Sequence, residues 1–101
     1  MKHILQIDFP HDGAFGEAFT NAFIDLADDI KVEDGLIWKI WTENKETKEA
    51  GGIYLFDTKE NAEQYAQKHM KRLRSFDYVD IRAKIFEVNE ALSVITKAKL
   101  D

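Results

Sequence analysis

The sequence predicts an α+β fold in which strands and helices follow the order βαββαβ. Segments with apolar residues at helical spacing alternate with short runs of β-branched and aromatic residues, and turn-forming residues separate them. The 101 residues contain no linker, internal repeat or low-complexity stretch, and a chain of this length builds one modest core. We therefore expect a single domain over residues 1–101.

The first strand is predicted over residues 3–9, where apolar side chains alternate with polar ones. A helix is predicted over residues 14–30, because its apolar residues recur at helical spacing. The turn between them supplies Asp12 as a candidate helix cap. His3 lies near the terminus and His11 lies in this turn, so we expect both at the surface.

The second and third strands are predicted over residues 36–43 and 50–56, joined by a polar hairpin loop over residues 44–48. Gly51 and Gly52 lie inside the third strand, where glycine is unfavourable. Such a pair marks a bulge or a close approach by another backbone or a ligand.

Both of these strands carry large apolar side chains on both faces. In the second strand, Trp38 and Ile40 share one face, and Ile37 and Trp41 share the other. A strand that is apolar on both faces needs two covers, whereas the two helices supply only one. We therefore expect a partner chain, a ligand or both to cover the helix-free face.

The remaining elements complete the pattern. A second helix is predicted to begin within the capping sequence of residues 57–60, and a fourth strand to span residues 78–88. The tail from Asn89 is predicted to form a short helix capped by that residue. Right-handed crossovers place both long helices on one face of an antiparallel sheet, which is a ferredoxin-like α+β sandwich.

The amino-acid composition and the sequence signatures argue against several kinds of partner. The net charge of −5 argues against a nucleic-acid partner. An RNA-binding module shares this element order, but its third-strand signature requires a basic residue and an aromatic where this chain has Glu49 and Ile53. The chain has no cysteine, no signal peptide and no apolar run that spans a membrane, so we expect a cytoplasmic protein without a membrane partner.

His69 is the main candidate for acid–base chemistry, because it lies on the apolar face of the second helix and histidine titrates near neutrality. The alternative is a core histidine with one hydrogen bond. No metal is expected, because Tyr65 and Leu73 occupy the positions four residues away where a second ligand would stand.

Five other side chains are candidate substrate-binding residues, each with a structural alternative. The aromatic ones serve equally well in packing, and an arginine in a strand is expected to pair with a carboxylate such as Glu43 or Asp80, or with a partner chain's acid. The candidates are Trp38, Trp41, Tyr54, Tyr65 and Arg82.

Several segments together resemble a known family. They are GLIWKIWTE over residues 35–43, EAGGIYLF over residues 49–56, and the shorter pieces Phe15-Gly16, Lys68-His69, Arg72-Leu73, Lys84-Ile85-Phe86, Val88-Asn89-Glu90, Leu92-Ser93 and Ala98-Lys99-Leu100. In these segments the chain resembles the YdhR-like putative monooxygenases, within the dimeric α+β barrel proteins.

The resemblance implies a homodimer in which two sheets face each other as a barrel. It also implies oxidation of a phenolic small molecule by dioxygen with no cofactor, neither metal nor flavin, and with His69 as the base. The alternative is a non-catalytic dimer that binds an aromatic or apolar small molecule.

Overall fold

The computed structural model describes residues 1–101 and has the predicted ferredoxin-like α+β fold. Four antiparallel strands form one sheet in the order β2-β3-β1-β4. The elements are β1 (His3–Pro10), α1 (Glu17–Ile30), β2 (Leu36–Asn44), β3 (Glu49–Phe56), α2 (Lys59–Ser75), β4 (Arg82–Glu87) and α3 (Glu90–Ile95). None of the helices is both long and apolar enough to cross a membrane.

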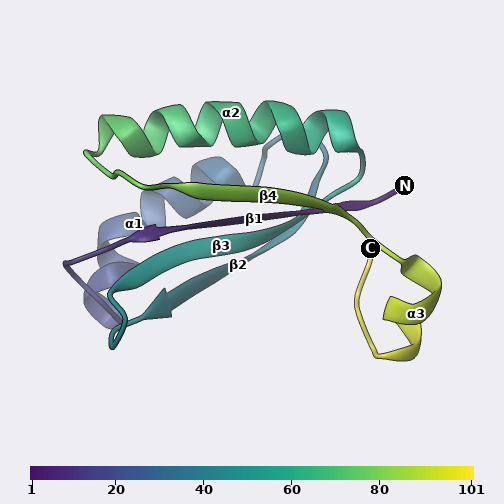
Figure 1. Cartoon of the computed structure of the whole chain (residues 1–101), viewed down its shortest axis with the longest axis horizontal. Coiled ribbons are helices and arrows are strands. Elements are labelled where there is room, and N and C mark those ends of the chain that lie inside the picture. The colour runs from purple at the N-terminus through teal and green to yellow at the C-terminus, as the bar shows by residue number, and fades with distance from the viewer.

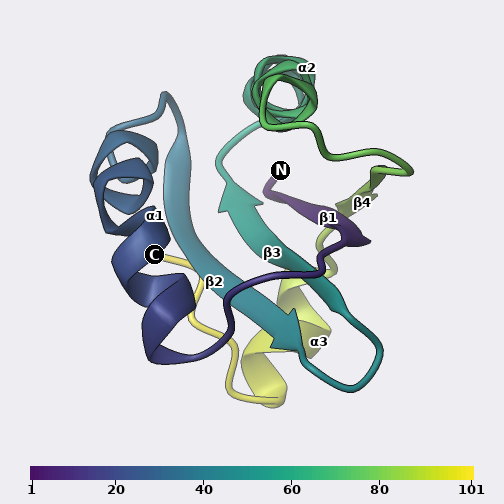
Figure 2. The same cartoon turned by 90° about the vertical axis from the view of Figure 1, so that its left-hand side faces the viewer.

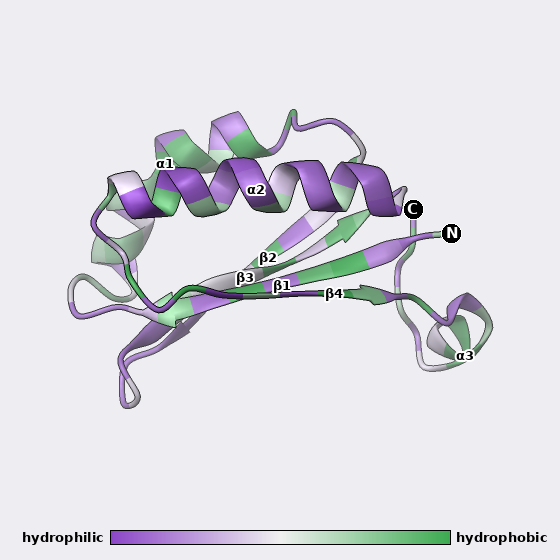
Figure 3. Cartoon of the chain, turned by 45° about the horizontal axis from the view of Figure 1, so that its top comes forward, coloured by the Kyte–Doolittle hydropathy of each residue, from purple (hydrophilic) through white to green (hydrophobic).

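The two long helices lie on one face of the sheet, and α3 with the C-terminal tail lies on the other (Figures 1 and 3). Figure 2 shows α2 nearly end-on above β3 and β1, with α1 beside β2. Because β2 is an edge strand, the space between it and α1 is open on one side of the molecule.

The core fills the space between the sheet and the helices. Alternate residues of the central strands face it, so that Leu5 of β1 lies opposite Tyr54 of β3 and Ile85 of β4. Both Leu5 and Tyr54 are buried, and Leu73 closes the core from α2. The alternation predicted for β1 is therefore confirmed.

Helix α1 begins later than predicted and Asp12 does not cap it. Gly16 occupies the N-cap position with φ of 63°, a conformation that glycine adopts without strain, and its N–H donates to Glu43 Oε1 at 2.8 Å. Asp12 instead faces Lys48 at 3.6 Å. Glu43 of β2 thus binds the backbone N–H of the N-cap residue, a contact between residues 27 apart in the sequence that local sequence reasoning does not predict.

The prediction that His11 lies at the surface was wrong. Its ring is buried, with Nε2 2.7 Å from the Ala14 carbonyl oxygen and Nδ1 2.8 Å from the Tyr78 hydroxyl. Phe15 and Phe19 pack edge-on against the same ring. His11 therefore holds together the loop that leads into α1. His3 is only partly buried and bonds the Met1 carbonyl oxygen.

Strand β4 is shorter than predicted and starts at Arg82 rather than Tyr78. Asp77 and Asp80 both have positive φ, 70° and 53°, so the segment before β4 is turned rather than extended. Tyr78 packs against Phe9 with ring centroids 4.3 Å apart.

The predicted cap of α3 is confirmed, since Asn89 accepts from the Leu92 N–H. Helix α2 begins where predicted, but its cap is Thr58, which accepts from the Asn61 N–H, rather than Asp57, the first residue of the predicted capping sequence. In the hairpin loop, Asn44 Oδ1 accepts from the N–H groups of two of the following residues.

The helix-free face has a partial cover from its own chain, which the sequence reasoning did not expect. Trp38 Nε1 donates to the Lys99 carbonyl oxygen at 2.8 Å, so the tail crosses this face at β2. Leu55 on the same face is fully buried. Ile40 and Phe86 remain 54% and 49% exposed, so the cover is incomplete.

Candidate functional site

A small cavity lies at the centre of the molecule, between the sheet and the two long helices. We call it the inner cavity; its volume is about 20 Å³. It is lined mainly by aromatic and apolar side chains, with one lysine and one histidine among them. The lining residues are Phe9, Phe19, Phe23, Leu26, Lys39, Trp41, Gly51, Tyr54, His69 and Leu73.

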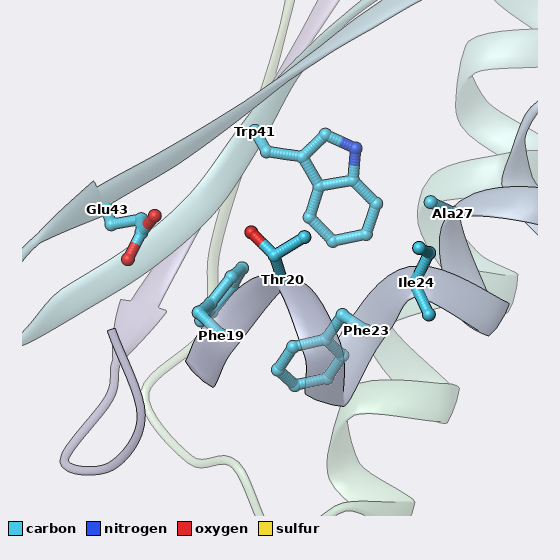
Figure 4. A pocket seen from close by; sticks show the side chains of 7 residues that line it. All are labelled: Phe19, Thr20, Phe23, Ile24, Ala27, Trp41 and Glu43. Atoms are coloured by element: carbon cyan, nitrogen blue, oxygen red, sulfur yellow. The ribbon is translucent and has the colours of Figure 1, made fainter. Parts of the chain in front are cut away.

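A larger pocket of about 240 Å³, the outer pocket, lies between α1 and β2 (Figure 4). It is lined by Phe19, Thr20, Phe23, Ile24, Ala27, Trp41 and Glu43. Figure 4 shows the Trp41 indole pointing from β2 toward α1, with Phe23 and Thr20 facing it. An apolar cavity of about 150 Å³ holds benzene, so the outer pocket suits a substituted aromatic of one or two rings.

Three residues line both spaces and form the wall between them: Phe19, Phe23 and Trp41. Phe19 and Phe23 are four residues apart on α1, which brings their rings to the same side with centroids 4.7 Å apart. The Trp41 centroid lies 6.3 Å from that of Phe19 and 6.5 Å from that of Phe23. A ligand in the outer pocket is therefore one aromatic layer from the inner cavity.

Lys39 is the charged residue of the inner cavity that sequence reasoning missed. It shares the helix-facing side of β2 with Trp41, and its Nζ lies 3.2 Å from the centroid of the Trp41 ring and 4.7 Å from that of Tyr54. A Cβ at Gly52 would come 2.6 Å from Lys39 Cε, so the glycine makes room for this side chain. The available signal was the alternation itself, since Lys39 lies between apolar neighbours on the same face as Trp41.

The Lys39 amine has no anionic partner. Its contacts are the faces of two aromatic rings, which attract a cation but do not replace its hydration. Burial and, to a smaller extent, the positive charge of Arg72 lower the pKa of Lys39 to about 7. Neutral and charged amine are therefore both populated near neutral pH.

His69 lies on α2 over the same cavity, as its sequence position predicted. The ring is buried and stacks on Tyr65 with centroids 5.2 Å apart, and its Nδ1 has no hydrogen-bond partner. Burial, followed by the charges of Lys39 and Arg72, lowers the pKa of His69 to about 3. The imidazole is therefore neutral at physiological pH, and a proton on it is costly.

Two tyrosines complete the polar cluster. Tyr54 of β3 and Tyr65 of α2 have ring centroids 5.0 Å apart, and the Tyr65 hydroxyl is buried without a partner. Burial raises the pKa of Tyr65 to about 12 and raises the pKa of Tyr54 further. Both remain protonated, so each can donate a hydrogen bond.

Arg72 has a carboxylate beside it, unlike Lys39. Its guanidinium lies 3.8 Å from Glu33 Oε1, and Lys68 Nζ lies 2.6 Å from the same oxygen. Glu33 follows α1, so this ion-pair group joins α1 to α2 behind the cavity.

The family model described as "Putative mono-oxygenase ydhR" matches residues 4–99. The chain belongs to this family. The match confirms the resemblance expected from the sequence segments, and it spans Lys39, Trp41 and His69 together.

A solved structure agrees with the fold. The crystal structure of a putative antibiotic biosynthesis monooxygenase from Deinococcus radiodurans is similar with a TM-score of 0.63 and 11% sequence identity, over 86% of this chain and 92% of that one. No curated protein sequence matches this chain. At this identity the neighbour supports the fold, and the YdhR family match supports the monooxygenase class.

The structure brings together four of the six residues singled out from the sequence: His69, Trp41, Tyr54 and Tyr65. Trp38 and Arg82 lie on the opposite face of the sheet, away from the cavity.

Arg82 bonds Asp8 and Glu49, at 2.6 Å and 2.5 Å. These are not the carboxylates of Glu43 or Asp80 that sequence reasoning named. Antiparallel register explains the difference, because Asp8 is directly opposite Arg82.

No group of three or more histidine, aspartate or glutamate side chains is placed to hold a metal ion.

Proposed function

We propose that this YdhR-family chain oxidises a small phenolic or enolisable aromatic with dioxygen, without a metal or flavin. One observation carries the proposal. An aromatic pocket of substrate size shares the Trp41 wall with an inner cavity lined by Lys39, which has no ionic partner, and by His69, whose buried Nδ1 has no hydrogen-bond partner. Such convergent polar groups beside an apolar pocket are typical of a ligand site.

The chemistry follows from the substrate. Triplet dioxygen reacts slowly with closed-shell molecules, whereas a deprotonated phenol or enol can give it one electron. Recombination of the two radicals forms a carbon–oxygen bond and gives a hydroperoxide. At a carbon that carries a second hydrogen, loss of water leaves a carbonyl. One oxygen atom enters the product, the other leaves as water, and no external reductant is required.

The side chains of the site have distinct roles in this proposal. Phe23 and Trp41 hold the aromatic ring, and the neutral His69 imidazole of the inner cavity hydrogen-bonds the oxygen atom that becomes negative. Donors in a water-poor site stabilise developing negative charge strongly. Because a proton on His69 is costly, we assign it hydrogen bonding to the substrate rather than storage of the proton.

The test is oxygen uptake by chelator-treated protein with a panel of anthrones and hydroquinones. We expect uptake above the uncatalysed rate, and a decrease in the variant His69→Ala. His3→Ala is the matched control, since His3 lies far from the cavity at the start of β1. Uptake that is abolished by the chelator would contradict the metal-free part of the proposal.

A non-catalytic binding protein is the competing function. The inner cavity of about 20 Å³ is too small to hold a ligand by itself. A protein that only binds its ligand would therefore hold it in the outer pocket, without contact to the inner cavity. No oxygen uptake, together with quenching of tryptophan fluorescence by the same compounds, would favour this function. The quenching should persist in Trp38→Phe and disappear in Trp41→Phe.

We also propose that the chain acts as a homodimer joined through its helix-free sheet faces. Ile40 and Phe86 remain half exposed there after the tail has covered its part. Apolar side chains gathered on an exposed sheet face favour association. Light scattering at micromolar concentration should give the dimer mass, and Phe86→Asp should shift it toward the monomer. A monomeric wild-type chain would contradict this proposal.

A further inference from the structure

We propose that Lys39 is a catalytic residue that takes the proton from the substrate hydroxyl and then holds the phenolate or enolate as an ion pair. The inference rests on the proposed function, because it concerns the same pocket. It replaces the sequence-based expectation that His69 is the base.

The position of Lys39 Nζ is the first argument. It lies 3.2 Å from the centre of the Trp41 ring, and that ring also lines the outer pocket. The lysine side chain is a flexible four-carbon stem. Lys39 lines the inner cavity and Trp41 lines both spaces, so in this proposal the amine reaches past the indole to a hydroxyl on an aromatic ligand in the outer pocket.

The missing counter-ion is the second argument. Other cations near the sheet have carboxylate partners. Lys68 and Arg72 share Glu33 on the helix-covered side, and Arg82 bonds Asp8 and Glu49 on the helix-free side. Lys39 contacts only the aromatic rings of Trp41 and Tyr54. A buried ammonium without an anion is expensive, and an anionic ligand removes that cost.

The groups that face Lys39 from each element favour an incoming anion. Helix α2 presents neutral His69 and the cation Arg72, β3 presents the neutral phenol Tyr54, and α1 presents only apolar side chains to the inner cavity. The one carboxylate of the outer pocket, Glu43, is held at the rim by its bond to the Gly16 N–H.

In the proposed step a proton moves from the substrate hydroxyl to Lys39. The substrate O–H bond breaks and its electron pair stays on oxygen, while the neutral Lys39 amine forms a new N–H bond and becomes an ammonium. The resulting phenolate is the electron donor for dioxygen. Lys39 is suited to this step because burial and Arg72 bring its pKa to about 7, so that part of the amine is neutral at physiological pH. His69, with a pKa near 3, would have to hold the proton against a larger cost.

The test uses 4-nitrophenol, whose ionised form is coloured, titrated with pH in the presence of the protein and without dioxygen. We expect the phenol to ionise at least about one pH unit lower when bound to the wild type than when free in buffer, because an ammonium beside a phenol favours the anion by about that much. In Lys39→Met this displacement should vanish while binding, followed by tryptophan quenching, persists.

Two further variants keep the result interpretable. Lys45→Met makes the same chemical change in the exposed hairpin loop and should behave like the wild type. Lys39→Arg keeps a positive charge but cannot be neutral near pH 7, so it should still bind the coloured anion and yet oxidise substrate at least about 10²-fold more slowly. Circular dichroism confirms that each variant is folded.

The outcomes separate the two proposals. An unchanged ionisation shift in Lys39→Met, or no shift and no binding in the wild type, would overturn the role of Lys39. Oxygen uptake at the wild-type rate in folded Lys39→Met would also overturn it while leaving the oxidation in place. A Lys39-dependent shift without any oxygen uptake would support the phenolate site and overturn the oxidation alone.

Discussion

The two faces of the sheet handle charge in opposite ways. On the helix-free face, Arg82 bonds Asp8 and Glu49, three charged groups that satisfy one another. On the helix-covered face, half-buried Lys39 and buried His69 have no ionic partner. Partnered charges stabilise a fold modestly, whereas unpartnered ones cost stability and are kept where they serve a ligand. This difference supports the proposal that the substrate site lies on the helix-covered face.

The largest expected effect is on oxidation through Lys39. Lys39→Met should lower the rate of oxygen uptake with an anthrone by about 10²-fold or more, because it removes the proposed base and the counter-ion of the phenolate. Steady-state oxygen-electrode measurements should show the loss mainly in kcat. A loss confined to KM would reduce Lys39 to a binding residue.

The largest expected effect on folding is at His11. His11→Ala removes two hydrogen bonds and the contacts with Phe15 and Phe19, and should lower the free energy of unfolding by about 2–3 kcal/mol. Urea denaturation measures it. His3→Ala, at a partly buried position, is the control, and equal effects in both variants would contradict the described role of His11.

Lys39→Met should also stabilise the protein, which distinguishes a functional charge from a structural one. The folded-state pKa near 7 lies below the ordinary 10.5, so the unfolded chain binds the extra proton between these values. The free energy of unfolding that the wild type loses by enclosing the Lys39 ammonium is therefore largest below pH 7. This loss decreases as the pH rises toward 10.5. We expect a gain of about 1–3 kcal/mol at pH 7 and none above pH 10.5, by urea denaturation across this range. A variant less stable than the wild type at pH 7 would contradict the cost assigned to this amine.

His69 should give a smaller effect with its own pH window. Its folded pKa near 3 lies below the ordinary 6.5, so the unfolded state gains a proton first as the pH falls. Stability is therefore lost between pH 6.5 and about pH 3. In His69→Gln this part of the acid destabilisation, about 1 kcal/mol at pH 5, should be absent from thermal melts. Parallel melts for both proteins would contradict the burial of a neutral imidazole.

The smallest effect on oxidation is expected from a substitution on the helix-free face. Arg82→Gln removes an exposed ion pair and should leave both oxygen uptake and the ionisation of bound 4-nitrophenol unchanged. A large loss of either would return Arg82 to the substrate site, where sequence reasoning placed it.

Sequence reasoning predicted the fold well because the signals that specify its helices and turns are local. Helical spacing, the Asn89 cap and the Asn44 hairpin loop are set by residues a few positions apart. The errors arose where distant residues decide. Glu43 of β2 accepts from the N–H of the N-cap residue of α1, and the Tyr78 hydroxyl bonds buried His11, 67 residues away in the sequence.

The site was predicted only in part for the same reason. His69 was placed toward the sheet because the apolar face of its helix must point inward, whereas both faces of β2 are apolar, so the facing of Trp41 stayed open. Lys39 was passed over because a lysine in a strand is usually exposed, and only the register that sets it opposite Tyr54 and beside Gly52 shows that it is enclosed. Arg82 was misplaced because facing along β4 does not reveal which side carries the helices.

The most direct test of the account is the titration of Lys39 followed by NMR of its side-chain carbon Cε, in free protein and with bound 4-nitrophenol. We predict a pKa near 7 in the free protein and a clearly higher one in the complex, because the phenolate stabilises the ammonium. A Lys39 that titrates with the exposed lysines in the free protein and does not respond to the phenol would contradict it.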